Sequence, residues 1–478
     1  MLKLKFLINV LFIIVGEDSD VKCVIYDPKI YKFWVIYDTM RKEEIISILS
    51  DWNFWGRGLD TGRERGNYLN KVLSFLGGVE KIISIYGVRR SGKSFLLRQV
   101  ARKISEEIGR NNVLYVNFEE VRFSGNSVNT LIDIYDAYRE FIRPNKKPLL
   151  ILDEVQEIRG WERFVRSLHE RGEARIIVSG SSAKLMSEEL ATLLSGRDIP
   201  VEVFPLSFSE FLEFKGVEVR KVEDTVIKRR EIIQKLREYI EFGGFPEVVL
   251  ENSEERRRAI LKRYFETILV KDVERRFKVR ERESLEFLAN FYMTNISSPV
   301  TYSRISKLLN IPKKTIERFS SYLATSRVLF FIKKFSQTLK EQEKAARKVY
   351  SIDTGISNAV GFKIFENYGK AIENIVAVEL IRRYSTLPTV KIYYFKIDEK
   401  EVDFILMEGL EIKQLIQVSY ISSMNEVEKR EVETLLRAGE KLKCNNLTII
   451  TWDLEDKITT ERGSIKLTPL WKWLLNLS

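Results

Sequence analysis

The chain has 478 residues, more than one compact core accommodates, and this length indicates about three domains. Hydrophobic residues make up 44% of it and charged residues 31%, a balance that excludes a disordered chain. Two widely separated cysteines and a single histidine exclude a disulfide framework, a structural zinc site and chemistry built on histidine pairs, and they are typical of a reducing cytoplasm.

The N-terminal segment contains a short apolar run, FLINVLFIIV at 6–15, preceded by two lysines. The run is short for a membrane span, and the acidic EDSD follows where a signal peptide would place small cleavage-site residues. We therefore expect a cytoplasmic protein without a membrane anchor, in which 1–39 is a buried strand or an extension upstream of the true start. Met40, which opens an amphipathic helix, is the alternative start.

Short apolar runs alternate with helical patterns between about 80 and 205. Strands are expected at 82–86, 113–117, 149–153, 175–179 and 201–204. Alternation at this spacing predicts a parallel sheet covered by helices on both faces, so the fold class expected is α/β.

Three further units follow this region. The sequence predicts a mostly helical segment at 206–292, interrupted by the turn FGGFP at 242–246. A compact helical unit with a short β-wing is expected at about 293–348, and a second α/β unit at 349–478.

A glycine-containing loop follows the first expected strand. GVRRSGKS at 87–94 fits the pattern G-x-x-x-x-G-K-[ST] and precedes a helical pattern. Such a loop turns its backbone N–H groups toward phosphate oxygens, and the helix N-terminus favours negative charge. Lys93 would reach the β- and γ-phosphates of ATP, while the Ser94 hydroxyl would ligate Mg²⁺. The residues expected to bind the nucleotide are Gly87, Val88, Arg89, Arg90, Ser91, Gly92, Lys93, Ser94 and Phe95.

An acidic pair ends the strand expected at 149–153. A nucleotide site of this kind needs a carboxylate for the metal, and Asp153 is expected to hold Mg²⁺ through water. Glu154 would polarise the attacking water, so the pair favours ATP hydrolysis over binding alone. The alternative is a strand that ends at a capping aspartate.

The order of these strands resembles that of AAA+ ATPases and their STAND relatives. The resemblance implies that Ser179, at the end of the next strand, senses the γ-phosphate. It also implies that Asn117 restrains the catalytic glutamate, although a simple turn cap is the alternative. Arg197 is a candidate finger or sensor arginine that would neutralise transition-state charge, and its alternative is a surface salt bridge.

Seven motifs recur in the same order in a prokaryotic ATPase family that is especially abundant in archaea. They are DWNFWGR (51–57), GVRRSGKS, LDEVQ (152–156), SGSS (179–182), SGR (195–197), PLSFSEFL (205–212) and YIEFGGFPEVV (239–249). The resemblance covers the chain from about residue 40 to its end. It implies a P-loop ATPase domain at 40–215, a helical lid at 216–292, a winged helix-turn-helix at 293–348 and a PD-(D/E)XK-like domain at 349–478, with 1–39 as an N-terminal extension.

Residues 301–350 carry a strong basic excess. They contain twelve Lys or Arg and three Asp or Glu, whereas the whole chain has a net charge of +11. Two helices at about 303–309 and 313–325 predict a helix-turn-helix, whose second helix would present basic and polar side chains to double-stranded DNA. These side chains are Lys313, Lys314, Thr315 and Arg318. A module used only for protein docking is the alternative.

The last unit resembles the PD-(D/E)XK nuclease core, in which a helix glutamate and two strand acids bind Mg²⁺. Glu373 on a helix and Asp403 on a strand match the first two positions. Gln417 stands where the second strand acid belongs, and Ser419 replaces the lysine that activates water. We therefore expect a degenerate binding domain rather than an active nuclease.

The leading hypothesis is an Mg²⁺-dependent ATPase that couples nucleotide state to contacts with DNA or a protein effector. One alternative is an ATP-regulated DNA nuclease. The other is a STAND-type signalling or scaffold ATPase without DNA, which would form a homo-oligomer when ATP is bound.

Overall fold

The computed structural model describes residues 11–15, 22–27, 32–36, 40–56, 58–78, 80–123, 125, 127–181, 194, 196–219, 221–362, 368–385 and 387–476, and before residue 40 it gives the backbone alone. There, β1 (Leu11–Val15), β2 (Lys22–Asp27) and β3 (Lys32–Ile36) form an antiparallel sheet. The apolar run at 6–15 is described only from Leu11 onward, as β1. No helix within the described ranges is long and apolar enough to cross a membrane.

A five-stranded parallel sheet forms the centre of the ATPase region. Its order is β5-β6-β7-β4-β8, and its strands are β4 (Ile82–Gly87), β5 (Val113–Asn117), β6 (Leu149–Asp153), β7 (Arg175–Ser181) and β8 (Asp198–Glu202). The fold class is therefore α/β, as the strand and helix alternation predicts. The last strand lies three residues earlier than its apolar run indicates, because Asp198 pairs with Ile82 and Val201 with Ile85.

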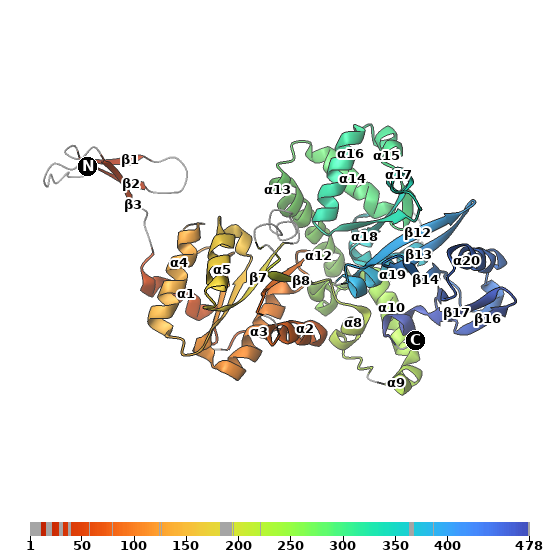
Figure 1. The fold of residues 1–478 in the computed structure, drawn as a ribbon, viewed down its shortest axis with the longest axis horizontal. Helices are drawn as coiled ribbons and strands as arrows, with labels where there is room; N and C mark the ends of the chain where they lie inside the picture. Colours follow the sequence, from red (N-terminus) through yellow and green to blue (C-terminus); the bar gives the residue numbers. More distant parts are fainter. Residues whose placement is uncertain are drawn as a thin grey trace.

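Helices cover both faces of this sheet (Figure 1). Successive strand residues alternate between the two layers, as the two-residue period of a strand requires. Ile83 and Ile85 pack with α2 (Gly66–Leu76) and α3 (Lys93–Ile108). Ile82 instead belongs to the core formed with α1 (Lys42–Asp51), α4 (Val128–Ala137) and α5 (Trp161–Glu170). Short π and 3₁₀ turns lie at Tyr138–Ile142, Arg110–Asn112 and Val155–Glu157.

The motif DWNFWGR protects the edge of the sheet at β5. The Asn53 side chain accepts a hydrogen bond from the Tyr115 N–H (2.8 Å) and donates one to the Tyr115 carbonyl (2.9 Å). The Trp55 indole N–H donates to the Val113 carbonyl (3.1 Å). These side chains satisfy backbone groups that an edge strand would otherwise leave open.

A helical region follows the sheet. Its elements are α8 (Phe208–Phe214), α9 (Val222–Ile227), α10 (Arg229–Phe242), α11 (Pro246–Leu250), α12 (Glu254–Thr267), the π-helix η4 (Ile268–Glu274), α13 (Arg275–Phe277) and α14 (Arg282–Thr294). The turn FGGFP joins α10 to α11 beside Asp353. A Cβ on Gly243 would lie 1.9 Å from an Asp353 carboxylate oxygen, and the Gly244 N–H donates to that carboxylate (2.7 Å). This close approach explains the glycine pair.

The predicted helix-turn-helix is formed by α15 (Tyr302–Leu309) and α16 (Lys313–Thr325). Asn310 adopts a left-handed conformation (φ 54°) and ends α15. The strands around this pair are β9 (Ser298–Val300), β10 (Leu329–Lys334) and β11 (Arg347–Ser351), and α17 (Leu339–Lys344) connects the last two.

These strands are not a separate wing. They belong to a nine-stranded sheet of order β16-β17-β15-β14-β13-β12-β10-β11-β9, in which β10 pairs with β12. The C-terminal members are β12 (Val390–Ile397), β13 (Lys400–Glu408), β14 (Glu411–Val418), β15 (Leu447–Thr451), β16 (Asp456–Thr460) and β17 (Gly463–Pro469). Strand β11 crosses the boundary expected at 348/349, and α14 crosses the one expected at 292/293.

Four helices complete the described part of the C-terminal region, and a 3₁₀ turn lies at Met424–Glu426. They are α18 (Thr354–Val360), α19 (Tyr368–Tyr384), α20 (Lys429–Leu442) and α21 (Leu470–Leu474). Asp353 caps α18 by accepting a hydrogen bond from the Ile356 N–H (3.3 Å). Burial raises the pKa of Asp353 to about 6, against the backbone N–H bonds that lower it.

Candidate nucleotide site

The loop at 87–94 lies between β4 and α3, as its sequence pattern requires. Gly87 passes so close to the neighbouring segment that a Cβ there would lie 2.1 Å from the Val203 carbonyl oxygen. Helix α3 begins at Lys93 without a side-chain cap, so its first N–H groups face the loop. A 16-residue helix with a free N-terminus provides donors and a dipole that favour an anion.

The polar side chains of the loop fit a phosphate. The Lys93 ammonium is buried and donates to the Gly87 carbonyl (3.0 Å) and the Val88 carbonyl (3.2 Å). The Ser91 hydroxyl is buried and has no hydrogen-bond partner among the described residues. Because a buried hydroxyl without a partner is costly, a phosphate oxygen in the loop would be a stabilising acceptor.

Asp153 lies at the carboxyl end of β6, within a network of hydroxyl groups. Its carboxylate accepts hydrogen bonds from Ser179 and from the Tyr115 hydroxyl (2.7 Å). Burial and the charge of Glu154 raise the pKa of Asp153, while hydrogen bonds from Ser179, Ser94 and Tyr115 oppose this shift. The structure therefore brings together Ser94 and Asp153, the two residues expected to ligate Mg²⁺.

Glu154 and Ser179 are held beside this network. Glu154 has a left-handed backbone (φ 53°), and its N–H donates to the Ser179 hydroxyl (3.2 Å). Its carboxylate accepts a hydrogen bond from Gln156. Ser179, on β7, thus connects both acids, which lie at the carboxyl end of the adjacent strand β6. This is the place expected for a residue that responds to the γ-phosphate.

Two loop arginines contact the helical region. The Arg89 guanidinium forms two hydrogen bonds with the Asp272 carboxylate on η4, both at 3.2 Å, and a third with Glu119 at 3.1 Å. Arg90 has φ 70° and lies over the ring of Tyr264 on α12, 5.7 Å from its centroid. The sequence places these arginines in the loop but does not identify their partners in the helical region, which lie more than 170 residues away.

Arg65 and Glu210 support the phosphate loop through a contact of Arg65 with the loop backbone, and the sequence did not predict this role. The two form a buried, bidentate ion pair with distances of 2.8 and 2.7 Å. Arg65 also donates to the Ser91 carbonyl (2.9 Å). Glu210 caps α8 as well, by accepting from the Ser207 N–H. Burial of the Glu210 carboxyl group raises its pKa, but the charge of the neighbouring Arg65 guanidinium opposes this effect. The net result is a lowered pKa of Glu210. The capping-box spacing within PLSFSEFL was the available signal.

Asn117 and Arg197 each make the contact that is expected for the alternative to a role at the nucleotide. The Asn117 amide oxygen accepts from the Glu119 N–H (3.0 Å), which is the turn-cap alternative. Arg197 precedes β8, at the opposite end of the sheet from the phosphate loop. Strand β4 separates the two ends by about 20 Å. Arg197 instead forms an exposed ion pair with Glu170 (3.1 Å), which is the surface salt-bridge alternative.

Phe95, the last residue expected in the nucleotide site, is partly exposed at 41%. The Arg98 guanidinium lies over its ring, 4.7 Å from the centroid. Its side chain therefore stands on the surface of α3 beside the loop.

The four side chains expected at a nucleic-acid interface do not share one environment. Lys313 forms an ion pair with Glu317 (3.5 Å), and Arg318 forms one with Glu281 (3.2 Å). Lys314 is exposed, whereas Thr315 is half-buried. Internal pairing therefore engages two of the three expected cations.

The two acids of the nuclease-like region do meet, but around a lysine. The Lys348 ammonium, on β11, donates to Glu373 (2.7 Å) and Asp403 (2.9 Å) and pairs with Glu401 (2.5 Å). Burial and the charge of Asp403 raise the pKa of Glu373 to about 8. Gln417, on β14, makes no described contact with this cluster. No group of three or more His, Cys, Asp or Glu in the described ranges is arranged to hold a metal ion.

Comparisons with known proteins identify an AAA domain in this chain and two uncharacterized relatives of it. Residues 79–212 match a family model described as an AAA domain, and 233–367 match a domain of unknown function (DUF8612). The uncharacterized protein MJ1544 of Methanocaldococcus jannaschii is 34% identical over 407 residues, which is 83% of this chain and 88% of that protein. An uncharacterized protein of Haemophilus influenzae is 31% identical over 419 residues, which is 86% of this chain and 98% of that protein.

Solved structures of P-loop ATPases are similar at low identity. The Walker-type ATPase paby2304 of Pyrococcus abyssi is 14% identical, with a TM-score of 0.42, and the match covers 62% of this chain and 95% of that one. AMPPCP-bound DnaA from Aquifex aeolicus is 20% identical, with a TM-score of 0.24, over 55% of this chain and 89% of that one. Both TM-scores are below 0.5, so the assignment rests on the family matches. The chain belongs to the family of AAA-domain proteins that includes MJ1544, and it is an AAA+-type ATPase.

Proposed function

We propose that this ATPase is an Mg²⁺-dependent, nucleotide-controlled switch, which couples ATP binding and hydrolysis to contacts with DNA or a protein partner. The observation that carries the proposal is the bidentate pair between Arg89 in the phosphate loop and Asp272 on η4. A phosphate bound in the loop would draw on the same guanidinium. Nucleotide state would therefore change the tie between the loop and the helical region.

The residues of the site have complementary roles in this proposal. Lys93 and the N-terminus of α3 bind the phosphates, and Ser94 and Asp153 hold the metal ion. Bound Mg²⁺ would neutralise phosphate charge and orient the transferred group. Glu154 orients the attacking water and accepts its proton. Ser179 is hydrogen-bonded to Asp153 and to the Glu154 N–H, so it would link the state of the phosphates to both acids.

The environment of Lys348 disfavours the alternative of an ATP-regulated nuclease. Its ammonium is buried between Glu373 and Asp403, where a nuclease of this type would hold its metal ion. Displacing a buried cation from two carboxylates is costly. The signalling alternative without DNA differs in its protein effector and in the homo-oligomer that it would form when ATP is bound.

The steady-state rate of ATP hydrolysis tests the proposal, measured with and without DNA over a series of salt concentrations. Lys93→Ala is expected to abolish turnover, and full activity in that variant would refute the site. A rate that DNA stimulates at low salt, with the stimulation fading as salt rises, supports coupling to DNA. A rate of ATP hydrolysis that DNA leaves unchanged, but that depends on protein concentration, favours the signalling alternative.

The switch itself is tested at Asp272. Asp272→Asn keeps the shape of the side chain but removes the charge that holds Arg89, so the ratio of stimulated to basal rate should change. Glu119→Gln is the matched control, because Glu119 is the exposed partner of the same guanidinium (3.1 Å). Equal behaviour of the two variants would show that the tie between loop and helical region has no role.

A further inference from the structure

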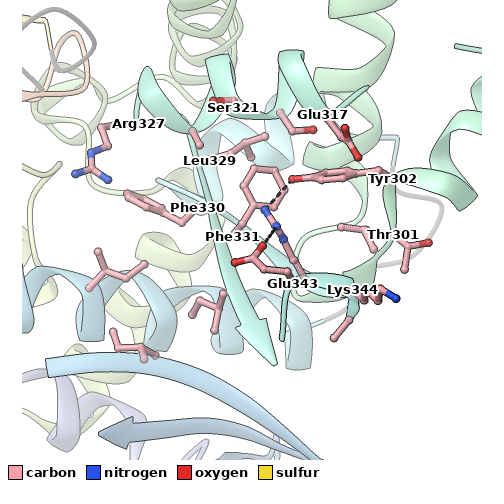
Figure 2. Close-up of a pocket in the computed structure, with 18 of the residues that line it drawn as sticks. Thr301, Tyr302, Glu317, Ser321, Arg327, Leu329, Phe330, Phe331, Glu343 and Lys344 are labelled. Carbon is pink, nitrogen blue, oxygen red and sulfur yellow. Dashed lines mark hydrogen bonds and ion pairs between the residues drawn. The ribbon is translucent and has the colours of Figure 1, made fainter. Parts of the chain in front are cut away.

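A groove of about 950 Å³ runs beside α16 and is lined on its other side by the end of α19 and the start of β12. Strand β10 forms its floor, from Leu329 to Ile332. Thr301 and Lys344 lie at one end of the groove, and Arg327 and Phe330 lie at the other (Figure 2). Four segments of the chain, within 300–303, 313–332, 343–347 and 381–392, therefore contribute to one concave surface.

One face of α16 lines this groove and the adjacent face does not. Lys313, Glu317, Ser321 and Ala324 line it, and their spacing of three or four residues places them along one side of the helix. Lys314, the next residue after Lys313, is exposed elsewhere on the helix. Entry into the DNA major groove, about 12 Å wide, needs a helix that stands clear of its neighbours. Helix α16 instead faces α19 and β12 across the groove, which disfavours a duplex.

The charges of the lining favour an anion. Four cationic side chains line the groove, against two glutamates; they are Lys313, Arg327, Lys344 and Arg347, and the glutamates are Glu317 and Glu343. Arg347 is paired with Glu343 (2.8 Å). Lys344 is exposed and forms no ion pair with any residue that the structure describes, so its charge is available to a ligand.

Aromatic and hydroxyl groups accompany these charges. Tyr302, Phe331 and Tyr384 are half-buried in the lining. Tyr302 and Phe331 point into the middle of the groove (Figure 2). Thr301 and Ser321 add hydroxyl donors. Aromatic rings on which bases stack, combined with cations and hydroxyls that bind phosphates, are the recurring chemistry of single-strand recognition.

We propose that this groove binds single-stranded nucleic acid. The inference rests on the proposed function, because it names the partner that the ATPase contacts. Bases stack on the aromatic side chains, and Lys344 binds the backbone phosphates. Recognition of this kind is tolerant of sequence, since every base offers a ring face.

The groove is also connected to the nucleotide loop. Arg327, at one end of it, forms an ion pair with the buried Glu202 on β8 (3.0 Å). The second oxygen of Glu202 accepts a long hydrogen bond from the Tyr86 hydroxyl (3.5 Å). Tyr86 directly precedes Gly87 of the loop. A phosphate near Arg327 competes with Glu202 for the guanidinium, so an occupant of the groove acts on the strand that carries the loop.

Binding of a labelled oligo(dT) of about 15 nucleotides tests the proposal, because single-strand sites span up to about 16 nucleotides. Fluorescence anisotropy with the full chain is measured for this strand and for a duplex of equal length over a salt series. Lys344→Ala should lower the affinity several-fold and reduce the slope of log affinity against log salt by about 0.7. Tyr384→Ala should lower the affinity about tenfold.

Two matched controls separate the groove from general basic charge. Lys340 is exposed one turn before Lys344 on α17 but does not line the groove, and Lys314 is exposed on α16 and does not line it either. Lys340→Ala and Lys314→Ala should leave binding of the single strand unchanged. Lys314, Lys340 and Lys344 are exposed, so none of the three lysine variants threatens folding.

Three other outcomes would each contradict a different part of the proposals. Tighter binding to the duplex, with Lys314→Ala weakening it, would show that α16 reads double-stranded DNA and that the groove does not. Single-strand binding unaffected by Lys344→Ala and Tyr384→Ala would refute the groove while leaving the proposed switch intact. No binding to either probe would refute the groove and the DNA part of the proposed function together, and ATP hydrolysis would then point to a protein partner.

Discussion

The phosphate loop and the nuclease-like region hold the same kinds of side chain in opposite states. Each contains a buried lysine and neighbouring carboxylates. Lys93 is bonded to two carbonyl groups of its own loop, which a phosphate readily replaces. Lys348 is bonded to three carboxylates from another helix and strand. The difference shows that availability, and not residue type, distinguishes a site that can accept a ligand from a cluster that is already neutralised.

The largest effect is expected at the nucleotide site, where Glu154 is predicted to act on the attacking water. Glu154→Gln keeps the shape of the side chain but removes the carboxylate that accepts a proton from water. ATP hydrolysis should fall by about 100- to 10,000-fold, while binding of a fluorescent ATP analogue should persist. Hydrolysis within a few-fold of the original rate would show that another group acts as the base.

The next effect compares the two lysines directly. Lys348→Met leaves buried carboxylates without a cation and should lower the stability by about 3–5 kcal/mol. Lys93→Met removes only bonds to loop carbonyls and should leave the stability nearly unchanged. Calorimetric unfolding of both variants provides the measurement. Adding Glu373→Gln to Lys348→Met should restore part of the loss, and equal midpoints for the two lysine variants would contradict the comparison.

Asp353 provides a third case for this comparison. It is a buried carboxylate that accepts hydrogen bonds from backbone N–H groups and, unlike the carboxylates around Lys348, has no lysine beside it among the described residues. Its pKa is about 6 in the folded chain and 3.8 in the unfolded reference, so the folded state binds more protons between these values. Its contribution to stability therefore falls by about 3 kcal/mol as pH rises from below 4 to above 6. Measured against Asp353→Asn, the original chain should lose stability across this window. A difference that stays constant with pH would exclude the shift.

The smallest effect is expected at Arg197, whose partner is exposed. Arg197→Ala removes one surface ion pair with Glu170 and should change stability by less than about 1 kcal/mol. Thermal unfolding at low and high salt checks this, because screening should remove even that difference. A larger loss would mean that Arg197 has a structural role that its exposed position does not indicate.

The sequence predicts those parts of the molecule that local spacing determines. The strands at 113–117 and 149–153, the loop at 87–94 and the acids at 153 and 154 follow from short patterns, and each lies where it was expected. The helix-turn-helix follows as well, because Asn310 and Pro312 mark the ends of its two helices.

The parts that the sequence did not reveal depend on contacts between distant residues. Arg65 and Glu210 are 145 residues apart, and Arg89 and Asp272 are 183 apart, so no local pattern connects them. Lys348 lies in a basic segment, where its sequence neighbourhood indicates a solvated face rather than a buried cation. Strand β8 begins three residues before the apolar run that predicted it, because its pairing with β4, and not its apolar content, sets its start.

The pairing of β10 with β12 limits how the chain can move and be divided. The strands that flank the helix-turn-helix and the strands of the C-terminal α/β region form one hydrogen-bonded sheet, so neither region can rotate without the other. They should unfold as one cooperative block, and limited proteolysis should release neither alone. A chain shortened after residue 348 would end inside β11 and expose its edge to aggregation. Any conformational change driven by the nucleotide would therefore move the helix-turn-helix and the C-terminal α/β region together, as one rigid unit.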